Sequence, residues 1–336
     1  MSLLANIPAV EVVENCQPDH IPDEIFASDV PVLLKGLVSS WPAVQTCKSS
    51  LPNAARYLSR FWTNAPVTVY VSDDNKGRFF YDDDCTGFNF KSGQAYLPQV
   101  MQKLHENEGD EGQAIYMGST NVDQWFPGFR KENDLAMPGD GLVSIWIGNK
   151  TCISAHYDFP DNIACVLAGK RRFTLFPPDQ IGNLYVGPVD RTPSGQAISL
   201  VDFSDPDLER FPRFEEAVNH ALVCDMEPGD AIFIPSMWWH HVEAFSPFNI
   251  LVNYWWITSE ANGGSPRDAL MHAMLAVRDL PERQRQAWRD IFDHYVFSAD
   301  DSVFEHIPEA GRGCLSPLNE KSALRLREEL LKRLNA

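Results

Sequence analysis

Ser154-Ala155-His156-Tyr157-Asp158 is the stretch of this sequence that decides the fold. A single residue separates His156 from Asp158. On an extended strand, residues two positions apart project to the same face of the sheet. The pair can therefore offer an imidazole nitrogen and a carboxylate oxygen to one ion. A His-x-Asp triplet is common by chance, so the interpretation depends on a third ligand elsewhere in the chain.

The third ligand has its best source in residues 227–243, EPGDAIFIPSMWWHHVE. A Pro-Gly-Asp turn leads into an apolar strand that ends at Pro235, and the pair His240-His241 opens the next strand. Side chains alternate along a strand, so only one of the two histidines can face the ion. Two imidazoles and one carboxylate on one face of an ion leave positions open for other ligands, which is typical of non-haem iron(II) oxygenases.

The sequence around these ligands is rich in β-strand signals. Short runs of β-branched and aromatic residues are separated by Gly, Pro and Asp, and they lie at 142–148, 163–168, 172–176, 231–235 and 249–256. Such spacing predicts a barrel or a sandwich. After residue 264 the strand signals stop, and helices are predicted at 266–277, 282–295 and 321–334.

Composition restricts the function classes. The 336 residues include 28 Lys and Arg against 46 Asp and Glu, a formal charge of -18 that disfavours binding to nucleic-acid phosphates or anionic lipids. No apolar run approaches the roughly 18 residues that span a bilayer, and the first residues lack a secretory signal. Seven cysteines without a C-x-x-C pair favour reduced thiols. We therefore expect a cytoplasmic protein that binds neither nucleic acid nor a membrane.

Three groups of residues resemble the cupin-like JmjC family of Fe(II)- and 2-oxoglutarate-dependent oxygenases, which includes the asparaginyl hydroxylase that acts on hypoxia-inducible factor. They are His156-Tyr157-Asp158-x-x-x-Asn162, the run Gly169–Pro178, and Pro228-Gly229-Asp230 through Trp238-Trp239-His240-His241. Upstream, Gly36-Leu37 and Trp41–Val44 are similar to the family's entry segment, so the resemblance spans about Pro31 to Trp256.

The resemblance implies a mainly β fold, the double-stranded β-helix or jelly roll of cupin and JmjC proteins, with N-terminal α/β elements and C-terminal α-helices. We expect an N-terminal entry segment at 1–110 that completes the barrel sheets. The barrel core follows at 111–260, with an insertion at about 186–214 that packs over its mouth. A helical appendage at 261–336 completes the chain, and because such helices often form a dimer interface in relatives, a homodimer is expected.

The same resemblance implies the ligand set. His156, Asp158 and His240 hold Fe(II), with His240 preferred over His241. The co-substrate 2-oxoglutarate meets a lysine in relatives, and Arg171 occupies that position here; Lys170 or Arg172 takes the role if the turn shifts by one residue. Relatives carry Thr or Ser three residues before the first ligand, where this chain has Ile153, so Ser154 and Thr151 are the candidate hydroxyls.

Further residues are assigned to the pocket. Tyr116, Asn162 and Asn253 are expected to contact the co-substrate. The expected walls of the substrate pocket are Trp255, Tyr157 and Trp239. No catalytic residue is expected beyond the metal centre.

The predicted function is an Fe(II)- and 2-oxoglutarate-dependent dioxygenase that hydroxylates a protein side chain or a small molecule. Two alternatives remain open. Because Arg171 and Ile153 depart from the family's pattern, the first is a metal-dependent cupin enzyme that does not use 2-oxoglutarate. The second is a non-catalytic barrel that acts as a protein-interaction module.

Overall fold

The computed structural model describes residues 3–73, 77–107, 112–193, 195–257 and 264–335. The chain divides into two compact units, Met1–Ile257 and Thr258–Ala336. The predicted boundaries at 110/111 and 260/261 fall on residues outside the described ranges. Strands from both sides of residue 110 share the two sheets of the first unit, as the predicted entry segment requires.

The larger sheet of the first unit has nine strands. Two β-branched runs, β9 and β14, pair antiparallel at its centre, with Asn253 opposite Ala164. Their positions explain why both sequences are apolar almost throughout. In spatial order the strands are β1 (Glu11–Glu14), β2 (Val32–Lys35), β12 (Ala231–Ile234), β9 (Asp161–Ala168), β14 (Asn249–Trp256), β7 (Leu142–Gly148), β6 (Ala114–Asn121), β3 (Val67–Ser72) and β5 (Phe90–Ala95).

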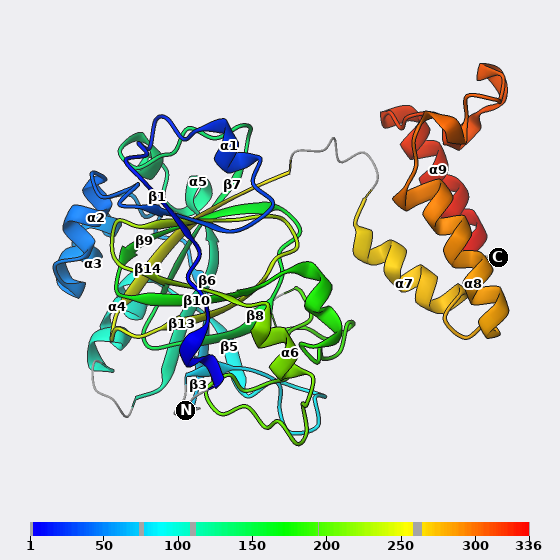
Figure 1. The fold of residues 1–336 in the computed structure, drawn as a ribbon. Helices are drawn as coiled ribbons and strands as arrows, with labels where there is room; N and C mark the ends of the chain where they lie inside the picture. Colours follow the sequence, from blue (N-terminus) through cyan, green and yellow to red (C-terminus); the bar gives the residue numbers. More distant parts are fainter. Residues whose placement is uncertain (1–2, 74–76, 108–111, 194, 258–263, 336) are drawn as a thin grey trace. The chain divides into compact units, whose positions relative to one another are not determined.

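The smaller sheet has five strands, in the order β11 (Leu222–Met226), β10 (Arg171–Phe176), β13 (Trp239–Ala244), β8 (Cys152–His156) and β4 (Arg78–Phe79). The sheets are shown in Figure 1. Apolar side chains from both sheets, such as Val166 and Phe173, form one buried cluster. The predicted class, a mainly β jelly roll with additional helices, is confirmed.

Helices and the outer face of the larger sheet form a second and larger apolar cluster. Leu58 of α3 and Leu104 of α4 are fully buried in it. The helix α3 begins where the Ser50 hydroxyl accepts a hydrogen bond from the Asn53 amide. The helical elements of this unit are α1 (Asp23–Phe26), α2 (Pro42–Cys47), α3 (Leu51–Ser59), α4 (Leu97–Glu106), α5 (Val122–Trp125), α6 (Phe214–Asn219) and the 3-10 turns Leu3–Asn6, Phe129–Lys131 and Pro178–Gly182.

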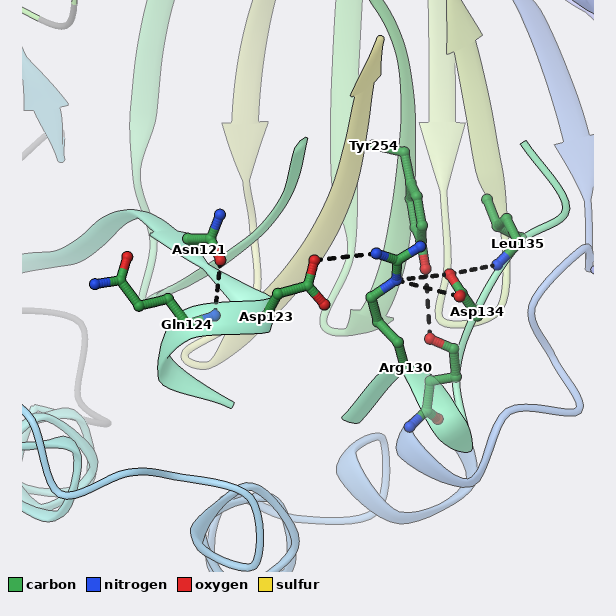
Figure 2. Close-up of polar contacts among 8 residues, drawn as sticks. Asn121, Asp123, Gln124, Arg130, Asp134, Leu135 and Tyr254 are labelled. Carbon is green, nitrogen blue, oxygen red and sulfur yellow. Dashed lines mark hydrogen bonds and ion pairs between the residues drawn. The ribbon is translucent and has the colours of Figure 1, made fainter. Parts of the chain in front are cut away.

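A charged loop after α5 closes one edge of this packing. Arg130 lies between Asp123 and Asp134, with its nitrogens 3.0 Å and 3.1 Å from their carboxylate oxygens (Figure 2). The hydroxyl of buried Tyr254, on β14, donates to the Asn133 carbonyl in the same loop. The loop is thereby tied to the central strand of the sheet.

The insertion at 186–214 packs against the smaller sheet. The amide of Ser199 donates to the Ala155 carbonyl of β8 at 2.8 Å. Phe203 and Phe211 of the insertion join a third apolar cluster that contains Phe176 and Trp239. These contacts hold the insertion beside the end of the barrel where β8 stops.

The second unit is helical, in agreement with the sequence. Its elements are α7 (Pro266–Ala276), α8 (Glu282–Phe292), the π-helix Asp293–Phe297, the 3-10 turns Asp301–Val303, Glu309–Gly311 and Gly313–Leu315, and α9 (Glu320–Leu334). Among its described residues only Val303 and Ala323 are buried hydrophobic side chains. Across the described parts of the chain, no helix combines the length and the apolar composition that a membrane crossing requires.

Candidate metal centre

Three side chains meet where β8 and β13 pair. His156, the last residue of β8, lies opposite His240 of β13 in the antiparallel register. One ligand atom from each of His156, Asp158 and His240 lies within 4.8 Å of the others. The strand ends at His156, so Asp158 belongs to the turn that follows and not to an extended strand. His156 and Asp158 lie together, as the sequence predicted, but only His156 is on the strand.

Hydrogen bonds fix both imidazole rings. Nδ1 of His156 donates to the Ser154 carbonyl, and Nδ1 of His240 donates to the Trp238 carbonyl, each at 3.0 Å. A carbonyl oxygen can only accept, so Nε2 of each ring keeps its lone pair. Burial and the neighbouring His156 lower the pKa of His240 to about 4, so this ring is neutral at pH 7. Two neutral imidazoles beside a carboxylate suit a divalent first-row metal ion.

Asp158 is held at both its backbone and its side chain. Its carbonyl accepts the Met237 amide at 2.9 Å, which ties the turn after β8 to the turn before β13. Oδ2 of its carboxylate lies 3.6 Å from Nε2 of His240 and accepts a hydrogen bond of 3.1 Å from the Trp255 indole. Trp255 therefore orients a metal ligand besides lining the cavity.

Replacing Trp255 with phenylalanine keeps a ring in place but removes the indole donor. Outer-shell hydrogen bonds to ligands contribute about 10-fold to 100-fold to metal affinity, so we expect Trp255→Phe to bind Co(II) about tenfold more weakly. Trp146→Phe is the matched control, because the Trp146 indole donates to Asn253 and not to a ligand. Competition against a chromogenic chelator measures both. Equal affinities in the two variants would mean that Trp255 does not position Asp158.

The triad opens into a cavity of about 440 Å³ between the two sheets. Six of the predicted co-substrate and substrate residues line it: Tyr116, Ser154, Asn162, Arg171, Asn253 and Trp255. The insertion, which was expected to pack over the mouth of the barrel, contributes Pro193, Gly195 and Ile198 to the lining. Metal ligands and co-substrate candidates thus share one enclosed space.

Arg171 is the unusual group in this cavity. Its side chain is buried, with 2% of the residue exposed, and its Nε and Nη2 have no hydrogen-bond partner among the described residues. Burial lowers the pKa of the guanidinium from its ordinary value. A buried guanidinium without a partner is costly, so this position calls for an anion.

The two neighbours of Arg171 point away from the cavity. The Lys170 ammonium is 2.7 Å from Glu227, and Arg172 forms a two-pronged ion pair with Asp225, also at 2.7 Å. All four side chains are exposed at the surface. Strand alternation along β10 therefore selects Arg171, and the register shift that would have brought Lys170 or Arg172 inward does not occur.

The predicted asparagines form a chain of hydrogen bonds. Asn253 Nδ2 donates to Asn162 Oδ1 at 3.3 Å, and Asn253 Oδ1 accepts from the Trp146 indole at 2.7 Å. The ring of Trp146 stacks on Tyr116 with 5.7 Å between centroids. The network fixes four side chains of the cavity wall against one another.

Three predicted pocket residues lie elsewhere. Tyr157 and Trp239 pack edge to face against each other at 4.9 Å, and Trp239 is buried among Phe176 and other apolar residues outside the barrel. Each is the chain neighbour of a metal ligand, and adjacent residues of a strand point to opposite faces of the sheet. Thr151 is buried but precedes β8 and does not line the cavity.

His241 also faces away from the triad. Its ring stacks on Phe203 at 4.2 Å, and its Nε2 lies 3.6 Å from the Cys152 sulfur. Burial lowers the pKa of His241 to about 3, which leaves it neutral. The preference for His240 as ligand agrees with this arrangement.

Several lining residues were not predicted from the sequence. Phe79 of β4, Phe90 of β5 and Tyr70 of β3 line the cavity, as does Trp146. Arg78 supports the wall from behind, because its Nε donates to Ser154 Oγ at 3.2 Å. Trp146 lies opposite Leu251 in the β7–β14 register, one alternation from Asn253. The sequence predicted the strand at 142–148 but gave no signal that Trp146 lines the cavity.

The fold and the triad together define a class, the cupin-type jelly roll with a candidate metal site at one end of its cavity. The chain belongs to the cupin-like domain family, of the JmjC type, whose model matches residues 18–262. Among curated proteins it is 33% identical to rat HSPB1-associated protein 1 over 53% of this chain and 40% of that protein. It is 28% identical to the lysine-specific demethylase JMJ31 of Arabidopsis thaliana, over 50% of this chain and 29% of the relative.

Mouse tRNA wybutosine-synthesizing protein 5 is 36% identical over 30% of this chain and 29% of its own length. In each of these three relatives the match spans less than half of the relative's length. Their names differ in what they act on. Family membership accordingly indicates an oxygenase or hydroxylase type of function and leaves the substrate open.

Proposed function

We propose that this protein is an Fe(II)- and 2-oxoglutarate-dependent dioxygenase that hydroxylates its substrate. The observation that carries the proposal is the unpartnered, buried guanidinium of Arg171 in the same cavity as His156, Asp158 and His240. A dicarboxylic co-substrate needs a metal at one end and a cation at the other. The cavity has a triad that could hold the metal and one buried cation, Arg171, with no other Lys or Arg among its described lining residues.

The donor set fits iron. Two neutral imidazole nitrogens and one carboxylate are the ligands of the facial triad, and the remaining positions of an octahedral ion stay open. When bound, Fe(II) supplies the oxidative chemistry that consumes 2-oxoglutarate and O₂ and inserts oxygen into a C–H bond. The protein's part is to bind, orient and enclose the reactants.

Individual residues divide this work. The carbonyls of Ser154 and Trp238 hold the protons on Nδ1 of the two histidines, so that both Nε2 atoms stay free to bind the ion. Trp255 orients the Asp158 carboxylate. Arg171 can grip a carboxylate through two parallel N–H donors, which lysine cannot do. The insertion residues Pro193 and Ile198 help to exclude water from the cavity.

Coupled turnover tests the proposal. Fe(II)-loaded protein supplied with 2-oxoglutarate and ascorbate should form succinate while it consumes O₂, slowly even without substrate. Asp158→Asn is the control for free iron in solution. Absence of succinate above the level of this control would reject the proposal in favour of a cupin enzyme of another type or a binding module.

The partner class follows from charge and from the cavity. We propose a peptide or protein side chain, or a small molecule, as substrate, and not nucleic acid, since the formal charge of -18 opposes contact with a phosphate backbone. A cytoplasmic location is proposed because the seven scattered cysteines, an odd number without a C-x-x-C pair, favour reduced thiols and so suit a reducing compartment.

We propose in addition that the C-terminal helices form a homodimer. Exposed apolar side chains recur on this unit, among them Leu275, Ile291, Phe297 and Leu331, with Phe297 77% exposed. Clusters of exposed apolar side chains often mark an interface with another protein. A second copy of this chain presents the same side chains and can cover them.

Multi-angle light scattering tests the dimer. The measured molar mass of the wild type should be twice that of one chain. In Leu331→Glu the mass should fall toward that of the monomer, because the substitution places a charge among the exposed apolar side chains. Leu208→Glu, at an exposed leucine of the barrel unit, should leave the mass unchanged. A monomeric wild type at micromolar concentration would disprove this part of the proposal.

A further inference from the structure

The lining of the cavity contains few charged side chains and many apolar ones. Among its described residues, Asp158 is the only acidic side chain and Arg171 the only Lys or Arg, and both have a role in the proposed function. Most of the remaining lining is aromatic or aliphatic, and includes Tyr70, Phe79, Phe90, Tyr116, Trp146 and Ile198. A substrate group that reaches the metal must therefore pass apolar walls.

Several polar side chains of the wall already have hydrogen-bond partners in the protein. Asn162 and Asn253 share a hydrogen bond, Ser154 accepts from Arg78, and Ser119 donates to Ser144 at 3.0 Å. A charged substrate group that loses its water beside this wall would need a partner of opposite sign, because leaving it unpaired costs several kcal/mol. The described lining supplies none beyond the groups already assigned to the metal and the co-substrate.

Charge balance of the loaded site leads to the same conclusion. A divalent ion and the Arg171 guanidinium carry three positive charges, and the Asp158 carboxylate with the two carboxylates of 2-oxoglutarate carries three negative ones. The loaded centre is neutral as a whole. It therefore adds no net charge that would draw either a cationic or an anionic substrate group toward the cavity from a distance.

Aromatic rings can also bind a methylated ammonium, but that requires ring faces turned toward an open space. Here one face of several rings is taken by a neighbouring ring. Phe88 stacks on Phe90 at 5.1 Å, Trp146 stacks on Tyr116 at 5.7 Å, and Tyr70 and Phe90 pack at nearly a right angle. These contacts leave fewer ring faces for a cation than a cage of separate rings offers.

Gly118 helps to keep that wall in place. A side-chain carbon at this position would come 2.7 Å from Cε2 of Tyr70, so only glycine lets the ring lie across β6. The Tyr70 ring in turn meets Phe90 edge to face. The aromatic wall is thus set by backbone as well as by side chains.

Resting on the proposed function, we infer that the group presented to the metal is a neutral apolar one, an aliphatic or aromatic C–H group of a small molecule or an uncharged side chain. A methylated lysine or another cationic group is disfavoured. The substrate inferred here therefore differs from the lysine named for the demethylase relative.

A binding comparison tests this inference without turnover. The probes are choline and its neutral isostere, in which carbon replaces the quaternary nitrogen, so that size and shape match while the charge differs. Ligand-observed NMR on Zn(II)-loaded, 2-oxoglutarate-saturated protein measures both. We expect the neutral probe to bind at least about tenfold more tightly, a difference of about 1.4 kcal/mol.

A matched pair of variants locates the effect. Phe90→Glu places a carboxylate in the wall and should reverse the preference toward choline. Phe245→Glu makes the same change at an exposed ring of the barrel unit that does not line the cavity, and should leave the preference unchanged. The comparison of the two probes on the wild-type protein tests the inference even if a variant does not fold.

Choline binding as tightly as the neutral probe, or absence of binding by the neutral probe, would overturn the inference. The two proposals fail separately. If the proposed function is wrong, 2-oxoglutarate does not bind the metal-loaded protein. The same sample shows this before the probes are added.

Discussion

Asp158→Asn should remove metal binding while leaving the fold intact. Asparagine keeps the size of the side chain and an oxygen that can accept the Trp255 indole hydrogen, but it removes the negative charge that the ion requires. Loss of a ligand should weaken affinity beyond the roughly 100-fold that loss of an outer-shell partner can cause. Titration with Co(II), followed by its absorption bands, measures the change.

His156→Ala should have an effect of the same size, because it deletes one of the two imidazoles. His220→Ala is the matched control, since His220 is an exposed histidine paired with Glu216 far from β8 in the sequence. Retention of wild-type Co(II) affinity by either Asp158→Asn or His156→Ala would show that the metal site lies elsewhere or does not exist.

Arg171→Met should separate metal binding from co-substrate binding. The substitution leaves the triad untouched but removes the cation expected to meet the distal carboxylate of 2-oxoglutarate. Breaking a buried charge pair by removing one partner costs about 3–5 kcal/mol, so the affinity for 2-oxoglutarate should fall by more than about 100-fold. Isothermal titration of metal-loaded protein without O₂ measures it.

The same variant makes a second prediction about stability. In the free protein the guanidinium is buried and lacks partners for Nε and Nη2 among the described residues, so an apolar replacement should raise the melting temperature. The wild type, in contrast, should be stabilised by 2-oxoglutarate and the variant should not.

Arg172→Met is the control for both measurements. Arg172 is the next residue of β10 but points outward to Asp225, so its loss should leave co-substrate affinity unchanged. Arg171→Lys should restore part of the affinity, since lysine supplies the charge without the two-pronged geometry. Equal 2-oxoglutarate affinity in Arg171→Met and the wild type would contradict the role of this residue.

The sequence was informative about strands and ligands because both depend on local patterns. The ranges 142–148 and 249–256 were predicted as strands and agree with β7 and β14. His156, Asp158 and His240 were identified from two short motifs, and strand alternation chose Arg171 over its neighbours only once the register of β10 was known.

Other features depend on contacts between segments distant in sequence. The aromatic wall draws Tyr70, Phe79, Phe90 and Trp146 from four different strands, and no local pattern indicates that these rings meet. Tyr157 and Trp239, predicted as walls of the substrate pocket, pack against each other and are not among the residues that line the cavity. Alternation along β13 and at the end of β8 sends their side chains to the opposite face.

One measurement tests the central claim most directly: the binding of 2-oxoglutarate to this protein, by anaerobic titration calorimetry, with and without Fe(II). If the triad and Arg171 form one site, 2-oxoglutarate should bind the iron-loaded protein with one molecule per chain and should bind the metal-free protein far more weakly. Iron that binds to the triad while 2-oxoglutarate does not bind at all would contradict the account.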